Sequence, residues 1–244
     1  MNIVSFSGGK DSTAMLLMML EKNMTVDKIV CVDTTKEFPQ MYEHIQKVQQ
    51  MIEPKKIEVV KIDFDYWFMK HVITGGKRKG NVGRGWPHFK LRWCTGLKKQ
   101  AISYLKNDIQ YDPKQEKYCN VKQLKVDYIE YHGIAFNELK RCDKNNKLIK
   151  YPLVEWKVTE QDCLAYCYSR GLDWGGLYKY FNRVSCWCCP FLRISELRIL
   201  YNKFPHLWNE LQQMDKKSWN QFRTDYSIED LTAKFEAEKL GFPK

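Results

Sequence analysis

Apolar and polar positions follow two different periods along the first half of the chain. Ile3–Phe6 is a short, largely apolar run typical of a strand, whereas Gln40–Met51 carries apolar residues at helical spacing. The pattern predicts strands at Ile3–Phe6, Lys28–Val32, Ile57–Ile62 and Tyr128–Ile134, and helices at Thr13–Lys22, Gln40–Met51 and Leu91–Leu105. Strands that alternate with helices favour an α/β fold, with a parallel sheet covered on both faces.

The second half of the chain is dominated by helical signals. Thr159–Asp162 predicts a helix start with Thr159 as N-cap, and this helix is expected to run to about Arg170, with Gly171 just past its end. From Arg193 onward the pattern predicts several helices, broken at Pro205 and near residues 216–218. We therefore expect a main domain over residues 1–192 and a helical C-terminal extension over residues 193–244. Residues 107–125 are polar and irregular, as in a surface excursion.

A glycine-containing segment, Ser5–Ser12, separates the first predicted strand from the first helix. Gly8 and Gly9 let the backbone approach a phosphate closely, and the helix that follows supplies unpaired amide donors and the positive end of its dipole. Lys10 adds a positive charge, and Asp11 is suited to orient the loop or to help hold Mg²⁺. The spacing is neither that of a Walker A loop nor Gly-x-Gly-x-x-Gly. The sequence thus predicts a phosphate site rather than a plain glycine turn.

Positive charge is concentrated in one part of the chain. The formal net charge is +11, and no Asp or Glu occurs from Tyr66 to Asn107, a stretch rich in Lys, Arg and Gly. Such acid-free basic segments often meet a ligand that carries phosphate. Residues 70–106 are therefore predicted to hold the backbone of a nucleic acid, either tRNA or DNA. A solvated basic face is the alternative.

No membrane segment is expected, because the longest apolar stretch, Ala14–Leu20, is far too short to span a bilayer. The chain also enters a strand-like run directly after Met1, without a signal-peptide pattern. We therefore expect a cytoplasmic protein. In that reducing compartment the nine cysteines, an odd number, are poorly explained by disulfides. Those that cluster are candidates for metal binding or thiol chemistry.

Four short motifs follow one another within residues 1–192. They are Ser5–Ser12; Cys31–Pro39, with an Asp-Thr pair followed by Glu and Pro; Arg92–Thr95 with Leu97 and Lys98; and Gly133–Ala135 with Glu138 and Arg141. Together they resemble the phosphoadenosine phosphosulfate (PAPS) reductase family of the PP-loop ATP pyrophosphatase, or adenine nucleotide α-hydrolase, superfamily. This resemblance implies a Rossmann-like parallel sheet that binds an adenine nucleotide across the carboxyl ends of its strands, as open α/β sheets generally do.

The resemblance also implies which residues bind the nucleotide, with ATP and Mg²⁺ as the expected ligands. The residues implied to hold phosphate are Ser5, Ser7, Gly8, Gly9, Lys10, Asp11 and Ser12. Asp33 and Thr34 are implied to lie beside the nucleotide. A helix-capping turn after a strand is the alternative interpretation of this Asp-Thr pair.

Three cysteines fall within four positions at Cys186-Trp187-Cys188-Cys189, directly before Pro190. Cys186 and Cys189 have Cys-x-x-Cys spacing, which lets two thiolates point at one metal centre. Cluster-containing members of the resembled family combine such a pair with an upstream cysteine group, for which Cys94 is the candidate here.

Two ligand sets for a [4Fe–4S] cluster are open. Either Cys94, Cys186 and Cys189 hold it with one open iron, as in tRNA-thiolating relatives, or Cys188 is a fourth ligand. A zinc tetrathiolate is the main alternative, followed by simple buried thiols. The remaining cysteines are Cys31, Cys163 and Cys167, expected in the core, and Cys119 and Cys142, for which the sequence indicates no role.

The leading hypothesis is an ATP-dependent enzyme that adenylates an oxygen of a nucleic acid and then replaces AMP by sulfur, with Lys10, Asp11 and Cys188 as candidate catalytic residues. A sulfur donor protein is a further expected partner. A sulfonucleotide (PAPS or APS) reductase is the alternative, but the family's C-terminal cysteine has no counterpart, because no cysteine follows Cys189. A non-catalytic nucleotide- or nucleic-acid-binding module is the third hypothesis.

Overall fold

The computed structural model describes residues 1–106 and 128–241, which form five strands, eight α-helices and four short helical turns. The strands are β1 (Asn2–Ser5), β2 (Lys28–Asp33), β3 (Ile57–Lys61), β4 (Ile129–His132) and β5 (Ile149–Lys150). The α-helices are α1 (Lys10–Glu21), α2 (Pro39–Met51), α3 (Trp93–Lys106), α4 (Pro152–Glu155), α5 (Glu160–Tyr168), α6 (Ile194–Lys203), α7 (Pro205–Lys217) and α8 (Ile228–Lys239). The short turns are η1 (Tyr66–Lys70), η2 (Gly76–Arg78), η3 (Phe136–Arg141) and η4 (Trp174–Lys179).

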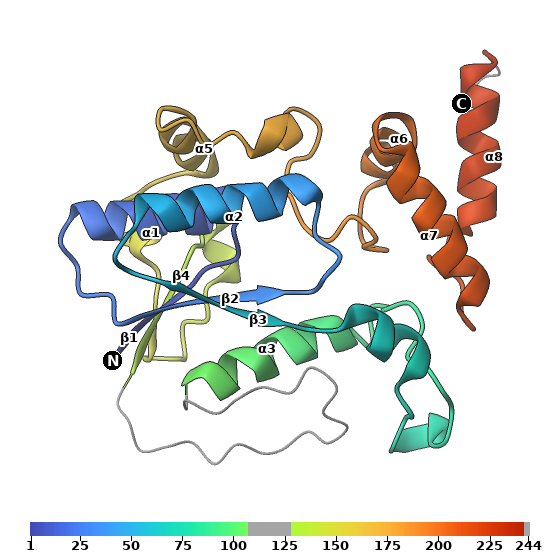
Figure 1. Cartoon of the computed structure of the whole chain (residues 1–244), viewed down its shortest axis with the longest axis horizontal. Helices are drawn as coiled ribbons and strands as arrows, with labels where there is room; N and C mark the ends of the chain where they lie inside the picture. Colours follow the sequence, from blue (N-terminus) through green and yellow to red (C-terminus); the bar gives the residue numbers. More distant parts are fainter. Residues whose placement is uncertain (107–127, 242–244) are drawn as a thin grey trace.

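The five strands form one parallel sheet in the order β3-β2-β1-β4-β5. Helices α1 and α2 cover one face of this sheet and α3 covers the other, while α5 packs against α1 (Figure 1). Strands β1 and β2 are buried on both faces, so their side chains are apolar over consecutive positions rather than alternating with polar ones. The predicted α/β fold with a Rossmann-like parallel sheet is therefore confirmed.

The strand order reverses between β1 and β4, and this reversal creates the crevice in which open α/β sheets bind ligands. The chain proceeds outward from β1 to β3, crosses the other face through α3, and returns to place β4 on the free side of β1. At the carboxyl end of β4, Gly133 packs directly on the first turn of α1. A Cβ at Gly133 would lie 2.7 Å from the Ser12 backbone nitrogen, so only glycine permits this approach.

Most predicted elements are confirmed, and the differences have local causes. Helix α1 begins at Lys10, three residues before the predicted start, because the end of the glycine loop is already its first turn. Strand β5 was not predicted, since two residues are too short to show a period. Thr159 does cap α5: its Oγ1 accepts a hydrogen bond of 3.2 Å from the Asp162 amide.

The C-terminal helices α6, α7 and α8 stand together at one end of the molecule (Figure 1). Pro205 separates α6 from α7 as predicted, and α7 ends at Lys217. The polar segment 107–125, with Cys119, and the last three residues lie outside the described part of the chain. Of the helices that the structure describes, none has both the length and the apolarity to cross a membrane.

The turn η4 braces the glycine loop from a distant part of the sequence. Trp174 Nε1 donates a hydrogen bond of 2.8 Å to the Gly8 carbonyl, and the Lys10 amide donates one of 2.8 Å to the Tyr178 hydroxyl. His44 of α2 stacks on the Trp174 ring at 4.1 Å and forms a 3.0 Å hydrogen bond with Thr13 Oγ1. The turn η4 thus holds the loop's backbone directly, and α2 supports η4 through His44.

We predict that Gly133→Ala weakens nucleotide binding and lowers the free energy of unfolding by about 1–3 kcal/mol, because the methyl group must displace backbone atoms of α1. Urea unfolding and nucleotide titration measure the two effects. Gly75→Ala is the matched control, since its Cβ meets nothing within 4 Å. Equal stability and nucleotide affinity of the two variants would contradict the prediction.

A second prediction concerns acid stability. Burial, with Lys47 adding to it, lowers the pKa of His44 to about 3 from its ordinary 6.5, so the folded state keeps the imidazole neutral. Between these values the unfolded chain binds the extra proton, so stability falls as pH drops below about 6.5. The loss at pH 5 is about 2 kcal/mol.

Urea unfolding of His44→Gln at pH 7 and pH 5 tests this, because the variant removes the titrating group. The variant should lose less stability between the two pH values than the wild-type protein does. His206→Gln, at an exposed position, is the control and should keep the wild-type difference. An unchanged difference in His44→Gln would rule out this role for His44.

Candidate functional site

A small polar pocket of about 100 Å³ lies at the carboxyl ends of β1 and β4, over the first turn of α1. It is lined by the predicted loop residues Ser7, Gly9, Lys10, Asp11 and Ser12, together with Gly133, Arg141, Tyr178, Arg183 and Val184. Gly8 has φ +75°, a left-handed conformation that glycine adopts without strain. This backbone and the start of α1 form a cradle suited to an anion.

Side chains of the loop already bond one another in this cradle. The hydroxyls of Ser7 and Ser12 are 3.0 Å apart, and Ser12 Oγ also accepts a 3.2 Å hydrogen bond from the Ser7 amide. Ser5 pairs with Val30 and His132 at the end of β1 and does not line the pocket. Six of the seven predicted phosphate residues are therefore at the pocket or in its loop, and Ser5 supports it from the strand.

Lys10 is buried beneath the pocket and is held by acidic partners. Its Nζ is 2.8 Å from Glu160 Oε1, 3.7 Å from Asp11 Oδ2 and 3.5 Å from the Asn182 carbonyl. Glu160 comes from the first turn of α5, far from the loop in sequence. Its charge compensates the buried ammonium, so Lys10 is fixed in one position beside the phosphate cradle.

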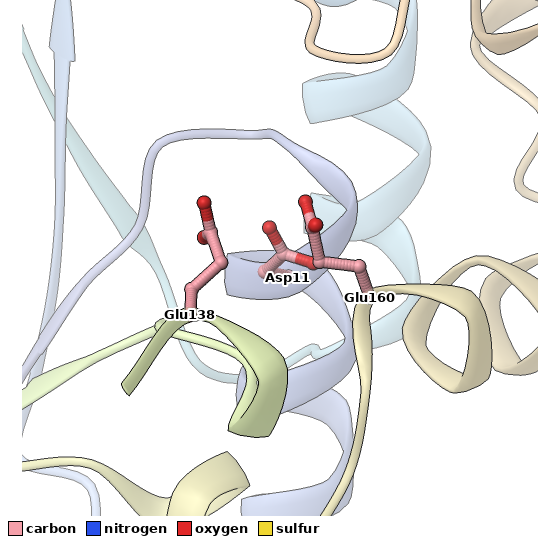
Figure 2. A group of neighbouring side chains, drawn as sticks. All are labelled: Asp11, Glu138 and Glu160. Carbon is pink, nitrogen blue, oxygen red and sulfur yellow. The ribbon is translucent and has the colours of Figure 1, made fainter. Parts of the chain in front are cut away.

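Three carboxylates converge beside Lys10: Asp11, Glu138 and Glu160 offer oxygen atoms that all lie within 4.8 Å of one another. They come from α1, η3 and α5 and face a common space (Figure 2). Burial raises the pKa of Asp11 to about 6; Lys10 opposes this effect, and Glu160 and Glu138 add to it. Oxygen ligands that repel one another are a suitable donor set for Mg²⁺, which would relieve the repulsion.

The sequence predicts Asp11 as a candidate Mg²⁺ ligand and places Glu138 in a motif, but it does not indicate Glu160 as a site residue. Glu160 was assigned only to the helix start at Thr159. The only sequence signal at Glu160 is its position in the first turn of a predicted helix. Carboxylates are common at such positions for structural reasons alone, so this position does not indicate a functional site. Only the packing of α5 on α1 brings it to Lys10.

A second, largely apolar pocket of about 250 Å³ shares Ser7 with the polar pocket and extends between β2, β3 and α2. Asp33 lies in it at the end of β2, where its Oδ1 accepts hydrogen bonds from the Thr35 amide at 2.6 Å and the Tyr42 hydroxyl at 3.0 Å. Met41 and Ile45 of α2 supply part of the apolar lining. A largely apolar pocket beside an anion cradle is the arrangement expected for a nucleoside next to its phosphates.

Thr34, the neighbour of Asp33, faces the cysteines and lines neither pocket. Its Oγ1 donates a 2.9 Å hydrogen bond to Glu37 Oε1 and lies 3.1 Å from Cys186 Sγ. The same Glu37 oxygen accepts from Cys186 Sγ at 3.4 Å and from Lys98 Nζ at 3.4 Å. Thr34, Cys186 and Lys98 therefore converge on one carboxylate oxygen.

The four candidate ligand cysteines divide by exposure. Cys94, Cys186 and Cys189 are partly exposed, whereas Cys188 is 1% exposed and packs in the hydrophobic core. Cys189 lies near enough to Cys94 and Cys186 for their charges to affect one another. Within the described residues, no three of these Sγ atoms are within 4.8 Å of one another. Zinc in a tetrathiolate site needs sulfur atoms about 4 Å apart, given Zn–S bonds of about 2.3 Å.

Lys98 provides a positive charge next to these thiols. Burial works against its ammonium, but Glu37 and then Cys186 and Cys94 outweigh burial, so the pKa of Lys98 is raised. Burial likewise raises the pKa of Cys186, where Glu37 adds to the effect and Lys98 opposes it. Binding of a cation would remove the cost of ionising these thiols, because thiolate is the ligand form.

Four other cysteines lie in the described part of the chain, namely Cys31, Cys142, Cys163 and Cys167. Cys31, Cys163 and Cys167 are buried in the core, as predicted, and burial raises the pKa of each. Cys142 is partly exposed, near the short strand β5. Of these four, Cys31 lies near the group around Glu37 and shares the apolar pocket with that residue.

Comparisons with known proteins agree with the first motifs. Residues 1–83 match the family model described as the phosphoadenosine phosphosulfate reductase domain. The chain is 25% identical over 217 residues to uncharacterized protein MJ0066 of Methanocaldococcus jannaschii, covering 87% of this chain and 41% of that protein. It is 24% identical over 219 residues to uncharacterized protein MJ0973 of the same organism, covering 84% of this chain and 45% of that protein.

The chain spans less than half the length of these two curated relatives. The family match ends at residue 83, within the glycine-rich basic loop of residues 74–90, yet the parallel sheet continues through β4 and β5. The family resemblance inferred from the glycine loop is thus confirmed over residues 1–83, which are similar to the phosphoadenosine phosphosulfate reductase domain and supply β1, β2 and β3 of the parallel sheet.

Proposed function

We propose that this protein is a PP-loop ATP pyrophosphatase. It transfers AMP from ATP to an oxygen of a nucleic acid, and a sulfur nucleophile then displaces AMP together with that oxygen. The observation that carries the proposal is the sharing of Ser7 by an anion cradle and an apolar pocket, with three carboxylates beside the cradle. A phosphate chain, a base and a divalent cation each have a matching environment there. ATP with Mg²⁺ contains all three.

The loop would hold the β- and γ-phosphates of ATP. The first amides of α1 and the hydroxyls of Ser7 and Ser12 are donors, and Lys10, Arg141 and Arg183 add positive charge around the pocket. Asp11, Glu138 and Glu160 would hold Mg²⁺ against the same phosphates. Arg141, which pairs with Glu138, would keep that carboxylate oriented.

In the reaction, an oxygen of the acceptor attacks the α-phosphorus of ATP and the bond to the β-phosphate breaks. Pyrophosphate leaves with the bonding electrons, and the acceptor oxygen loses its proton to solvent or a base. The loop amides would stabilise the charge that develops on pyrophosphate, and Mg²⁺ held by Asp11, Glu138 and Glu160 would supply further positive charge there. AMP is then a good leaving group, and a sulfur nucleophile displaces it from the acceptor.

The partly exposed thiols of Cys94, Cys186 and Cys189 fit a [4Fe–4S] cluster better than one zinc ion. Each thiolate of such a cluster binds a different iron, so the sulfur atoms need not come as close together as around zinc. Cys188 is buried away from solvent, which supports the three-ligand set. Bound there, a cluster would supply iron sites able to carry sulfur beside the activated acceptor.

The burial of Cys188 also favours the transferase over a sulfonucleotide reductase. A reductase needs a cysteine that reaches the sulfate sulfur of its substrate, and the Cys188 thiol is enclosed in the core. The basic stretch 70–106 supports a nucleic-acid acceptor, because its charge is suited to a phosphate backbone.

We predict that Asp11→Asn and Glu138→Gln each lower Mg²⁺-dependent pyrophosphate release from ATP by on the order of 100-fold, because the charge on the leaving group loses its counter-ion. The assay contains ATP, Mg²⁺ and RNA or DNA. Glu229→Gln, at an exposed position on α8, is the control and should keep wild-type activity.

The same assay separates the alternatives. Pyrophosphate release that needs added RNA or DNA supports the transferase. Sulfite release from PAPS or APS with a thiol reductant would instead establish a reductase. Nucleotide binding with neither activity would indicate a non-catalytic module and would refute the proposed chemistry.

A further prediction concerns the metal. Protein purified without oxygen should be brown and contain iron, and Cys94→Ser, Cys186→Ser and Cys189→Ser should each lose most of it. Cys142→Ser, also partly exposed but distant in sequence from the other three, is the control and should keep its iron. Cys188→Ser should retain iron if three ligands hold the cluster. Colourless protein with one zinc per chain would contradict the prediction.

A further inference from the structure

A largely apolar pocket with a volume of about 570 Å³ lies outside the nucleotide site. Three segments line it: residues 87–89 of the basic loop, residues 190–193 directly after the cysteine cluster, and residues 219–225 between α7 and α8. Its volume is within the range of about 300–1,000 Å³ usual for small-ligand sites. Neither pocket at the sheet's carboxyl edge shares a residue with it.

Aromatic rings face solvent at this pocket. Phe89 is 81% exposed and lies 5.0 Å from the ring of Phe191, and Trp219 is 48% exposed. Trp219 is held in place through its indole nitrogen, which donates a 3.2 Å hydrogen bond to the Gly83 carbonyl. Large exposed rings gathered at one cavity are typical of a surface that binds a flat ligand by stacking.

Arginine guanidinium groups lie over two of these rings. The Arg92 guanidinium lies 4.7 Å from the Phe191 ring, and that of Arg78 lies 3.0 Å from the Trp219 ring. Both belong to the stretch from Tyr66 to Asn107, which contains no acidic residue. Arginine beside exposed aromatic rings is the combination that single-stranded nucleic acids use, with bases on the rings and phosphates on the cations.

The wall opposite the basic loop is rigid. Arg223 donates hydrogen bonds to the carbonyls of Pro190 at 2.9 Å and Leu192 at 2.7 Å, and it pairs with Asp225. This fixes the segment after Cys189 against the turn between α7 and α8. The two chain segments that bear the candidate cluster ligands, before Cys94 and after Cys189, therefore also form the pocket.

We propose that this pocket binds one unpaired base of a single-stranded nucleic acid, with Phe89 and Trp219 as stacking surfaces and Arg78 and Arg92 against the flanking phosphates. The proposal rests on the proposed function for the identity of the acceptor, and it adds where that acceptor is held. A base bound there lies next to the cysteine site. Because stacking dominates the binding, the pocket accepts different bases. Duplex nucleic acid binds less tightly, since its bases are already paired.

Fluorescence anisotropy with labelled single-stranded DNA and RNA oligonucleotides tests the proposal, without ATP. Phe89→Ala should bind both strands about 5- to 150-fold more weakly, as expected for the loss of one stacked base. Phe89 is so exposed that its truncation leaves the core untouched. Trp219→Ala should behave similarly, and Trp219→Phe should recover most of the affinity. Tyr168→Ala, an exposed ring on α5, is the control.

A strand of abasic sites separates stacking from charge. Phe89→Ala should bind the abasic strand as the wild-type protein does, whereas Arg92→Gln should weaken both strands and reduce the salt dependence of binding. A preference between the DNA and RNA arms identifies the acceptor. Wild-type affinity of Phe89→Ala and Trp219→Ala for base-containing strands would overturn the proposal, as would an equal loss on abasic strands.

The result is independent of the ATP chemistry. If the variants lose oligonucleotide affinity while no pyrophosphate release is found, the pocket stands and the proposed enzymatic function fails. If pyrophosphate release is nucleic-acid dependent but the variants bind normally, the acceptor is held elsewhere and only the pocket is refuted. Binding of a protein partner at this pocket, with no effect of the variants on oligonucleotides, would likewise refute it.

Discussion

The carboxylate of Glu37 joins the two halves of the candidate active site. One of its oxygens accepts hydrogen bonds from Thr34, Cys186 and Lys98, while the residue also lines the apolar pocket beside Asp33. Cys186 is held through this oxygen against the loop after β2, and Lys98 brings α3 to the same point. The Glu37 side chain is 11% exposed, so the loss of these donors would leave its carboxylate poorly solvated. The distance between nucleotide and thiols is therefore set by a few side chains around one carboxylate.

The parts of this site that could be predicted from the sequence are the local ones. Ser5–Ser12 shows its phosphate cradle directly, because glycines, a following helix and a preceding strand are all adjacent in the chain. The cap at Thr159 was predictable for the same reason. Asp33 and Thr34 were predicted together beside the nucleotide, but successive side chains at a strand end point in opposite directions. Asp33 therefore enters the apolar pocket while Thr34 turns to Cys186.

Contacts between distant segments could not be predicted from one sequence. Glu160 meets Lys10 only because α5 packs along α1, and Trp174 reaches the Gly8 carbonyl only because η4 lies over the loop. Neither residue type carries a local signal of these roles, since an acidic residue in a first helical turn and a Trp in an irregular segment have common structural explanations. Likewise, the spacing of the Cys186–Cys189 motif shows that its thiols can share a metal but not that Cys188 faces the core.

The region after residue 192, predicted as a separate helical extension, is bonded to the basic loop of the preceding residues. Asn220 donates to the Trp86 carbonyl and accepts from its amide, the Trp86 indole donates to Asp215, and Trp219 donates to the Gly83 carbonyl. Four hydrogen bonds therefore join the basic loop to this region. Lys36, beside the cysteine segment, is paired with Glu210 of α7 as well. A loop with this many glycines loses considerable entropy on ordering, and these bonds offset part of that cost. Helices beyond residue 192 thus determine the shape of a surface whose charge and cysteines come from the residues before it.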